Sequence, residues 1–382
     1  MDFDLSDEQR AIQALCREFA REEVAPRAEE MDRTGEFPLD LVRKMAELGL
    51  MGLPFPEEYG GAGADTISYA LAVMEIAAAD ASTAITLAAH VSLGATPFLL
   101  FGTEEQKREY LVPLARGERL WGFGLTEPGA GSDAGATQTR AELRDGTWVI
   151  NGTKAFITNS GTEITGGTTI TAITAMRPDG RPEISDLIVP QSTPGFTRSK
   201  RYRKMGWRAS DTRELSFADA RVPEGNLLGE RGKGLHQFLQ ILDGGRISVA
   251  ALSVGLATGA FEEARKYAQE RGQFGQAISK FQAIQFKLAD MLTEIEHARV
   301  MVLKAAWEKD QGRDFALTAS LAKLYSGEVS RRVVNEAVQI HGGYGFMEEY
   351  PVSRFYRDQK INEIGEGTNE VQRMVIARLM GL

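Results

Sequence analysis

The hydrophobic periodicity of this chain changes twice, near Trp121 and near Gly229, and these changes restrict the folds that it can adopt. Before the first change and after the second, apolar residues recur at the spacing of amphipathic helices. Between them, short runs rich in β-branched and aromatic residues are separated by turn-forming pairs. The pattern predicts an α+β protein with an N-terminal helical domain over 1–118, a middle β domain over 119–228 and a C-terminal helical bundle over 229–382.

Local signals add detail to this outline. Ser6 and Gln9 have the spacing of a capping box and predict a helix that begins after Ser6. Asp145-Gly146 predicts a tight hairpin turn between two strands. Asn151-Gly152, a few residues later, predicts a second turn.

Composition excludes several classes of function. The chain has 382 residues and a formal net charge of −9, which argues against a nucleic-acid-binding surface. Cys16 is the only cysteine and the four histidines form no His-x-x-x-His pair, so no metal site is expected. The N-terminus has no basic-then-apolar leader, which predicts a cytoplasmic protein. Acidic residues and a histidine interrupt the apolar region 67–100, so we expect a buried helix there and not a membrane span.

The most unusual local feature is a carboxylate between two glycines, Gly365-Glu366-Gly367. Glycines allow the backbone to approach another surface closely and to adopt torsions that other residues resist. Thr368 follows as the expected N-cap of a last helix. Taken alone, Glu366 would most simply be a solvated turn carboxylate.

A second glycine-rich stretch, 121–133, opens the predicted β domain. Backbone N–H groups among small residues can bind a phosphate or the polar edge of a flavin. The stretch is not a dinucleotide-binding fingerprint, because Gly129-Ala130-Gly131 lacks the required third glycine and no βαβ unit surrounds it.

Five motifs in this order resemble the acyl-CoA dehydrogenase family, and the resemblance covers the whole chain. They are the 121–133 stretch, Lys154-Ala155-Phe156-Ile157-Thr158-Asn159, Arg271-Gly272-Gln273-Phe274-Gly275, Gln339-Ile340-His341-Gly342-Gly343 and Glu366-Gly367-Thr368. The resemblance implies a C-terminal four-helix domain, FAD as cofactor and a homotetramer built from dimers.

The resemblance also implies which residues form the site. Those expected along the flavin and the thioester are Phe123, Leu125, Thr126, Ser132, Phe156 and Thr158. Those expected to reach the adenine and pyrophosphate of a neighbouring subunit's FAD are Arg271, Phe274, Gln282, Gln339 and Gly343. Thr368 and Glu370 are expected as further FAD contacts, and the substrate is expected at Ser132, Asp243, Arg246 and Gly367.

In this family pattern Glu366 is the catalytic base that removes the α-proton of an acyl-CoA thioester, while N5 of FAD accepts the β-hydride. The product would be the trans-2-enoyl-CoA, and the electrons would pass to an electron-transfer flavoprotein. Two alternatives remain open at this point. The same fold serves flavin oxidases or monooxygenases that use oxygen, and an inactive relative would bind acyl-CoA without reaction.

The acyl chain is predicted from three features. One family variant carries its base at the position of Gly245, which here has no side chain, and Gly365 replaces an aromatic residue of medium-chain members. Glycines at 244 and 245 either allow close helix packing or leave room for the substrate. In the second case, a leucine at 245 would slow the reaction of long or branched thioesters selectively. Residues 45–106 contain no Lys or Arg, which disfavours a dicarboxylyl substrate. We expect an uncharged acyl chain, short to medium or branched.

Overall fold

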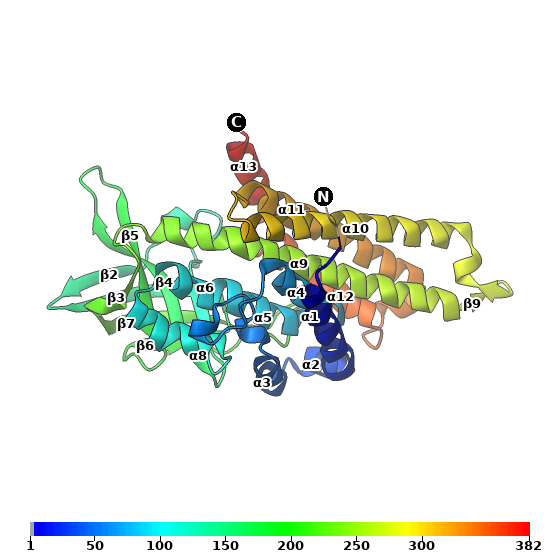
Figure 1. Ribbon diagram of the computed structural model, residues 1–382, viewed down its shortest axis with the longest axis horizontal. Helices are drawn as coiled ribbons and strands as arrows, with labels where there is room; N and C mark the ends of the chain where they lie inside the picture. The colour runs from blue at the N-terminus through cyan, green and yellow to red at the C-terminus, as the bar shows by residue number, and fades with distance from the viewer. Residues whose placement is uncertain (1–3) are drawn as a thin grey trace.

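The computed structural model describes residues 4–382 as an elongated molecule with a β-sheet at one end and long helices along its length (Figure 1). The order of helices, sheet and helices predicted from the sequence is confirmed. α9 connects the two ends: it starts beside the sheet and finishes near β9 at the opposite end.

The N-terminal part consists of helices joined by short 3-10 and π turns. They are α1 (Asp7–Phe19), α2 (Ala28–Thr34), α3 (Leu39–Glu47), α4 (Thr66–Ala79), α5 (Ala81–Ala89), α6 (Thr96–Phe101), α7 (Glu104–Gln106) and α8 (Val112–Ala115). The predicted capping box is confirmed, because the Ser6 hydroxyl accepts from the Gln9 N–H and the Gln9 side chain accepts from the Ser6 N–H.

The middle part is one eight-stranded sheet. Its strands are β1 (Leu120–Gly124), β2 (Arg140–Arg144), β3 (Thr147–Thr158), β4 (Thr165–Met176), β5 (Pro182–Pro190), β6 (Phe196–Arg198), β7 (Thr212–Pro223) and β8 (Leu227–Leu228). The strand order is β6-β7-β3-β2-β4-β5-β8, and β1 pairs in parallel with β4. The sheet has a hydrophobic cluster of its own that includes Trp148, Leu187 and Phe217.

One of the two predicted turns is present. Asp145 and Gly146 connect β2 to β3 with φ of 49° and 73°, as a tight hairpin turn requires. The prediction of a second turn at Asn151-Gly152 is wrong, because both residues lie within β3. The pairing of β3 with β7 shifts register there, and a Cβ on Gly152 would lie 2.4 Å from Oγ1 of Thr139. The pair marks a β-bulge, which is the other common use of glycine in a strand.

The C-terminal part is dominated by three long helices. Its elements are α9 (Gly234–Glu270), the hairpin of β9 (Gly272–Gln273) and β10 (Gln276–Ala277), α10 (Gln282–Asp310), α11 (Ala316–His341), α12 (Pro351–Gln359) and α13 (Asn369–Leu379). Gly255 and Gly259 let α9 approach α4, since a Cβ on either would lie 2.2 Å from a carbonyl oxygen of Met74 or Ala78.

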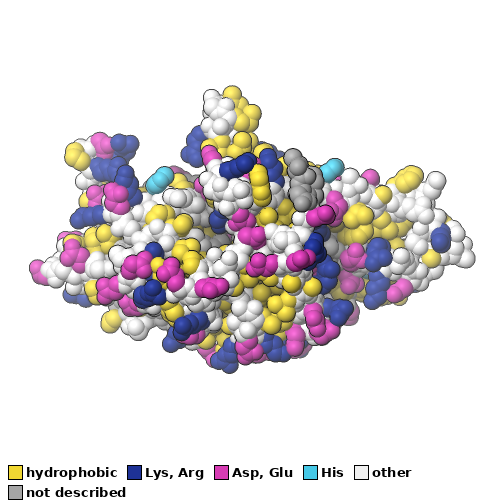
Figure 2. Space-filling view, in the orientation of Figure 1, with side chains coloured by type: hydrophobic (Ala, Val, Ile, Leu, Met, Phe, Trp, Pro, Cys, Tyr) yellow, Lys and Arg dark blue, Asp and Glu magenta, His cyan; other side chains and the backbone are white. Residues whose placement is uncertain are grey.

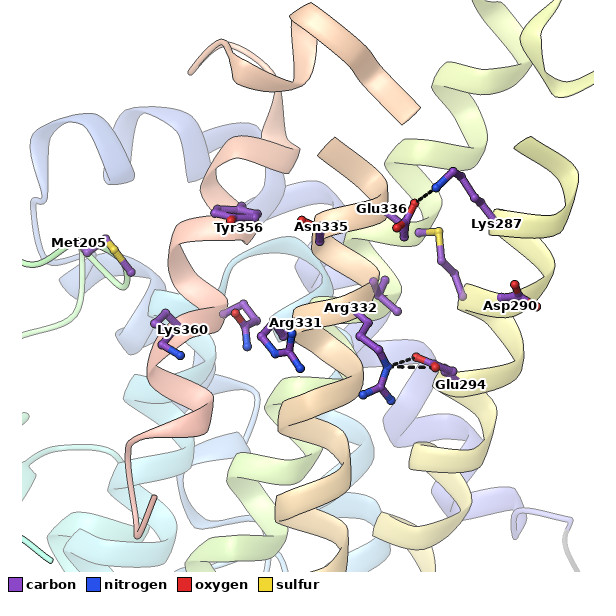
Figure 3. Close-up of a pocket in the computed structure, with 13 residues that line it drawn as sticks. Met205, Lys287, Asp290, Glu294, Arg331, Arg332, Asn335, Glu336, Tyr356 and Lys360 are labelled. Atoms are coloured by element: carbon purple, nitrogen blue, oxygen red, sulfur yellow. Dashed lines mark hydrogen bonds and ion pairs between the residues drawn. The ribbon is translucent and has the colours of Figure 1, made fainter. Parts of the chain in front are cut away.

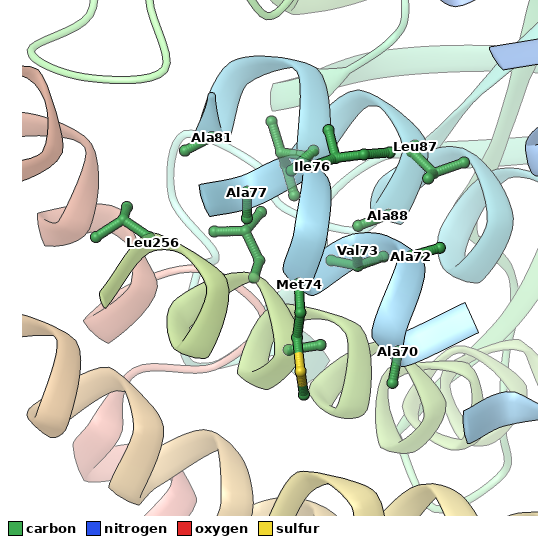
Figure 4. Close-up of a cluster of buried hydrophobic side chains, with 14 of the residues drawn as sticks. Ala70, Ala72, Val73, Met74, Ile76, Ala77, Ala81, Leu87, Ala88 and Leu256 are labelled. Carbon is green, nitrogen blue, oxygen red and sulfur yellow. The ribbon is translucent and has the colours of Figure 1, made fainter. Parts of the chain in front are cut away.

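The two helical parts share one hydrophobic core, which runs from α1 through α4 and α9 to α12. Figure 4 shows its centre, where α4, with Val73, Met74 and Ala77, packs against α9, which carries Leu256. Two helical stretches, Ala81–Phe101 and α9, are long and apolar enough to cross a membrane, but 72% and 78% of their apolar windows are buried inside the protein. Core helices have the same property.

Candidate active site

Glu366 lies in the short connection between a 3-10 turn, Lys360–Glu363, and the N-terminus of α13. Its φ is 52°, in the left-handed region that non-glycine residues rarely adopt, and φ of Gly367 is 93°. Thr368 is the N-cap of α13, as predicted, and its hydroxyl accepts from the Val371 N–H at 3.2 Å. Strained backbone of this kind persists where surrounding contacts hold it, and it is concentrated at functional sites.

The carboxylate of Glu366 points into the protein. Oε2 is buried and has no hydrogen-bond partner among the described residues. A Cβ on Gly245 of α9 would lie 2.2 Å from this oxygen and 3.4 Å from Cδ2 of Leu93. Burial raises the pKa of Glu366 to about 7, although Lys323 and Arg246 both act to lower it. A carboxyl group poised near neutrality is well suited to general-base catalysis.

Arg246 lies one residue after Gly245 and is the nearest buried arginine on α9. Its side chain is buried and pairs with Asp243, and its Nη1 donates to Oγ of Ser320 on α11 at 3.2 Å. Nε of Arg246 has no partner among residues 4–382. Of the predicted substrate residues, Gly367 follows Glu366 in the chain, the charge of Arg246 acts on Glu366, and Asp243 is linked to this group through its ion pair with Arg246.

Ser132 stands apart from this group. It is exposed in the loop between β1 and β2, where a Cβ on either neighbouring glycine, Gly129 or Gly131, would meet only open space. The loop therefore leaves backbone accessible beside the sheet.

The predicted flavin-facing residues lie at the junction of the sheet and α9. Phe123 of β1 stacks on Phe238 of α9 with ring centroids 3.9 Å apart. The Ala155 N–H donates to the Thr126 carbonyl at 2.8 Å and so holds the segment after β1 against β3. Leu125 and Thr126 therefore lie against Lys154 and Ala155, the residues that precede Phe156 in β3.

Phe156 has the geometry expected of an aromatic surface kept free for a ligand. Phe156 has no partner residue on β7, because the register of the β3–β7 pairing shifts between Lys154 and Ile157. Its φ is 63°, and the residue is 66% exposed. The ring contacts Tyr202, with centroids 5.5 Å apart, but most of its surface stays exposed on strained backbone. A planar ring such as isoalloxazine fits this surface, since aromatic faces stack favourably.

A buried ion pair supports this segment from below, and its role was not predicted from the sequence. Lys154 is fully buried, and its Nζ donates to Oε1 of Glu127 at 2.8 Å and to the Leu125 carbonyl at 3.2 Å. Glu127 also accepts from the backbone N–H groups of Gln138 and Thr139. The network ties the flavin-facing segment to β3 and to the loop before β2.

The second set of predicted cofactor residues lies at the other end of the molecule. Arg271 is the C-cap residue of α9. Its guanidinium lies 5.6 Å from the ring centroid of Tyr344, a residue in the turn after α11. Phe274, in the β9–β10 hairpin, is 93% exposed with φ of 51°. In Figure 2 this end of the molecule is mainly white, with a few hydrophobic side chains on its surface. Phe274 also lies edge-on to Phe281, the residue before Gln282, with ring centroids 6.1 Å apart, and Gln339 and Gly343 lie at the end of α11 and in the turn that carries Tyr344.

The two sets of cofactor residues do not meet within one chain. The 37 residues of α9 separate Gly234, beside the sheet, from Arg271. At 1.5 Å per residue this is about 55 Å. Figure 1 shows the sheet and β9 at opposite ends of the molecule. Residues at both ends can contact one cofactor only if it lies between two copies of the chain.

Two hollows are present on the C-terminal helices. One of about 150 Å³ lies beside the N-terminus of α13 and is lined by Thr368 and Glu370 among others. The larger, of about 640 Å³, lies between α10, α11 and α12 and is lined by none of the predicted site residues (Figure 3). Its walls carry the ion pairs Lys287–Glu336 and Arg332–Glu294. Within residues 4–382 no group of three or more His, Cys, Asp or Glu side chains is placed to hold a metal ion.

Three family models match the chain in succession. They are the N-terminal domain of acyl-CoA dehydrogenase over residues 6–118, the middle domain over 122–220 and the C-terminal domain over 232–381. Among curated relatives, the probable acyl-CoA dehydrogenase YngJ of Bacillus subtilis is 57% identical and covers 99% of both chains. The short-chain specific acyl-CoA dehydrogenase of Clostridium acetobutylicum is 48% identical, with the same coverage.

Solved structures agree with the sequence matches. Butyryl-CoA dehydrogenase from Megasphaera elsdenii is 47% identical, covers 100% of both chains and superposes with a TM-score of 0.97. A chain from a structure described as the electron transferring flavoprotein of Acidaminococcus fermentans is also 47% identical, with a TM-score of 0.95 over 100% of this chain and 99% of that one. Acyl-CoA dehydrogenase complexed with FAD from Bacillus anthracis is 39% identical, with a TM-score of 0.92 over 99% of this chain and 68% of that one. The chain therefore belongs to the acyl-CoA dehydrogenase family, oxidoreductases that act on CH–CH bonds with FAD as cofactor.

Proposed function

We propose that this enzyme oxidises a short, uncharged acyl-CoA thioester to the trans-2-enoyl-CoA, with Glu366 as the base that removes the α-proton. The observation that carries the proposal is the buried, unpartnered Oε2 of Glu366, held between Gly245 and two buried cations, Lys323 and Arg246. Its pKa of about 7 keeps a large share of the group ionised at neutral pH and still lets it hold the abstracted proton.

The backbone at the base supports activation of the thioester. The α-proton of a thioester is weakly acidic, so its removal needs donors directed at the carbonyl oxygen where negative charge develops. The Glu366 N–H makes no hydrogen bond with any of the residues 4–382, and a Cβ on the preceding Gly365 would meet nothing closer than the Ile361 carbonyl oxygen at 3.4 Å. We assign this N–H as one donor to the thioester carbonyl.

The cofactor site follows the two clusters described above. Phe123, Leu125, Thr126, Ser132, Phe156 and Thr158 would hold the ring end of FAD, with Thr368 and Glu370 beside it. When bound, FAD supplies the acceptor for the hydride that leaves Cβ. The separation of the two clusters along α9 supports a shared site, in which Arg271, Phe274, Gln282, Gln339 and Gly343 come from a second copy. The homotetramer that the family resemblance implies, a dimer of dimers, would provide this arrangement.

Substrate length and electron acceptor rest on separate arguments. Relatives named for short-chain and butyryl-CoA activity cover nearly the whole chain, which favours a short acyl group. The absence of Lys and Arg from 45–106 disfavours a substrate with a terminal carboxylate. The similarity to a chain solved in work on an electron transferring flavoprotein supports such a protein as the acceptor.

The direct test is an anaerobic titration of the purified holoenzyme with butyryl-, hexanoyl-, isovaleryl- and glutaryl-CoA, followed through bleaching of the flavin absorbance. We expect fast bleaching by the short uncharged thioesters and none by glutaryl-CoA. The reduced enzyme is then mixed either with air-saturated buffer or with an electron-transfer flavoprotein. Fast reoxidation by air alone would favour an oxidase, and no bleaching by any thioester would contradict the proposal.

A further inference from the structure

The strained backbone at Glu366 is held from two helices. Nε2 of Gln372, on α13, donates to the carbonyl oxygens of Glu366 and Gly367 at 3.2 and 3.1 Å. Nζ of Lys323, on α11, donates to the same Gly367 carbonyl at 2.7 Å. Both side chains are fully buried. The left-handed torsions at Glu366 and Gly367 therefore depend on one neutral and one charged donor.

Lys323 is an unusual residue for its position. It lies on the buried face of α11, next to Ala319 and Ala322, where apolar side chains are the rule. Within residues 4–382 it forms no ion pair closer than 4.0 Å, and Asn369 Oδ1 at 3.4 Å is its other contact. A buried ammonium group without a paired carboxylate is costly, so its retention calls for a reason beyond packing.

The neighbours of Lys323 give that reason. Ser320, one turn earlier on α11, accepts a hydrogen bond from Arg246. One face of α11 therefore carries Lys323 and also contacts Arg246, the two cations that act on Glu366. Glu366 is in turn the carboxylate that most favours the charged form of Lys323.

We infer that Lys323 is a positioning residue for the reaction proposed above: it fixes the backbone of Glu366 through the Gly367 carbonyl, and its charge favours the ionised carboxylate. The inference rests on the proposed function for its consequence in catalysis. The contact with Gly367 and the effect on the ionisation of Glu366 are properties of the resting protein and are measurable without substrate.

The groups around Glu366 define the pH range in which Glu366 and Lys323 are both ionised. Burial raises the pKa of Glu366 to about 7 and lowers that of Lys323 to about 8. On α9, Arg246 faces Glu366 with Asp243 as its own partner, and on α4 the hydroxyl of Tyr69 is buried nearby. Glu363, Glu370 and Arg378 act on these cations from a greater distance. Base and lysine are both ionised to a large extent only between about pH 7 and about pH 8.

Two matched variants separate charge from position. Lys323→Met removes a donor to Gly367 together with a positive charge, whereas Gln372→Met removes a donor to the same carbonyl and no charge. We expect both to slow anaerobic flavin reduction by butyryl-CoA. Only Lys323→Met should move the ascending limb of the pH profile upward, by about one unit, because an opposite charge near a carboxylate lowers its pKa by about 1–3 units. Below both pKa values, the ionised fraction of Glu366 then falls about tenfold.

A second readout needs no turnover. Infrared difference spectra of the resting holoenzyme, recorded against pH, follow the protonated carboxyl band of Glu366, which is identified by its loss in Glu366→Gln. We expect this band to persist to higher pH in Lys323→Met and to be unmoved in Gln372→Met. Since no acyl-CoA is present, this result is independent of whether the proposed substrate is right.

Lys204→Met is the control, because Lys204 also has a pKa lowered to about 8 and donates to a carbonyl, that of Ser210, without contact with Glu366. It should leave both readouts unchanged. If Lys323→Met loses FAD or melts early, Lys323→Gln replaces it, since the amide drops the charge and keeps a donor. An unmoved carboxyl band in a folded, FAD-loaded variant at position 323 would overturn the inference.

Discussion

The carboxylate of Glu366 occupies the space that a side chain at position 245 would need, since a Cβ on Gly245 would lie 2.2 Å from Oε2 and 3.1 Å from Cδ of Glu366. The glycine therefore makes room for the base. Neither close helix packing nor space for the acyl chain, the two explanations that the sequence suggested, describes this contact. Gly244, its neighbour, faces elsewhere, and a Cβ there would lie 3.5 Å from Nζ of Lys309.

This contact changes what a substitution at 245 is expected to do. Gly245→Ala should displace the carboxylate and slow flavin reduction by every thioester alike, in place of the selective loss on long or branched chains expected from the sequence. Gly244→Ala is the matched control: it gains about 0.5–1 kcal/mol of helix propensity, meets only ordinary contact and should reduce the flavin at the wild-type rate. Stopped-flow reduction with butyryl- and hexanoyl-CoA compares the two, and a loss confined to hexanoyl-CoA would restore the pocket explanation.

Replacing the base itself gives the second prediction. Glu366→Gln is nearly isosteric, so we expect it to retain FAD and to bind acyl-CoA. Flavin reduction should fall by several orders of magnitude, because the amide cannot take the α-proton. Asp243, the nearest other carboxylate on α9, is committed to Arg246. Anaerobic bleaching measures the rate, and near-normal bleaching by a variant with bound FAD would mean that another group is the base.

Much of the fold was predictable because the period of the apolar residues changes with the secondary structure. The strands β1 to β8 lie within 119–228, where the pattern predicted the β domain, and Thr368 caps the last helix as its position suggested. The error at Asn151-Gly152 has a physical cause, since the same dipeptide suits a hairpin turn and a β-bulge.

The site was less predictable than the fold, because it depends on contacts between distant segments. Gly245 and Glu366 are 121 positions apart in sequence, and no local pattern brings them together. Lys323 left one signal that was overlooked: a lysine among alanines on the apolar face of a predicted helix. The bond from Lys154 to Glu127 spans 27 positions and likewise emerges only in three dimensions.

The third prediction concerns the shared cofactor site. Arg271→Ala removes an exposed cation that would bind pyrophosphate through charge-assisted bonds, which a neutral side chain cannot replace. Because FAD would then bridge two copies, its loss and the dissociation of the oligomer are coupled by mass action. We expect faster FAD release and more dissociation on dilution in sedimentation experiments. Arg265→Ala, which breaks only the exposed pair with Glu262, is the control. A fully FAD-loaded monomer would contradict the shared site.

The fourth prediction tests the buried pair under the flavin-facing segment. Burial lowers the pKa of Lys154 to about 8, whereas Lys154 and its neighbours hold the pKa of Glu127 at about 2 against the effect of burial. Lys154→Met leaves Glu127 buried without its counter-ion and should cost about 3–5 kcal/mol of unfolding free energy. The double variant Lys154→Met/Glu127→Gln should recover part of this. Denaturant unfolding measures the unfolding free energy of the wild type, the two single variants and the double variant. Additive losses would show that the two residues act independently.

A cluster of buried charges joins all three parts of the fold at α12. Oδ1 of Asp358 accepts from the Trp207 N–H at 2.6 Å, while its Oδ2 has no partner among residues 4–382. Asp80, which precedes α5, lies 3.9 Å from Arg354 of α12. Burial, followed by the charge of Asp80, raises the pKa of Asp358 to about 7. The folded state therefore favours the protonated form of this carboxyl group.

The sign of the resulting pH dependence follows from that shift. A carboxyl whose folded pKa lies above its unfolded value of about 4 stabilises the fold fully below that value, and the contribution is lost as pH rises through about 7. Asp358→Asn, which keeps an acceptor for the Trp207 N–H and cannot ionise, should therefore gain melting temperature over wild type as pH rises from about 5 to about 8. Asp179→Asn, at an exposed ion pair with Arg181, is the control and should show no such trend. A constant difference between Asp358→Asn and wild type across this range, followed by calorimetry, would mean that Asp358 stays ionised in the folded protein.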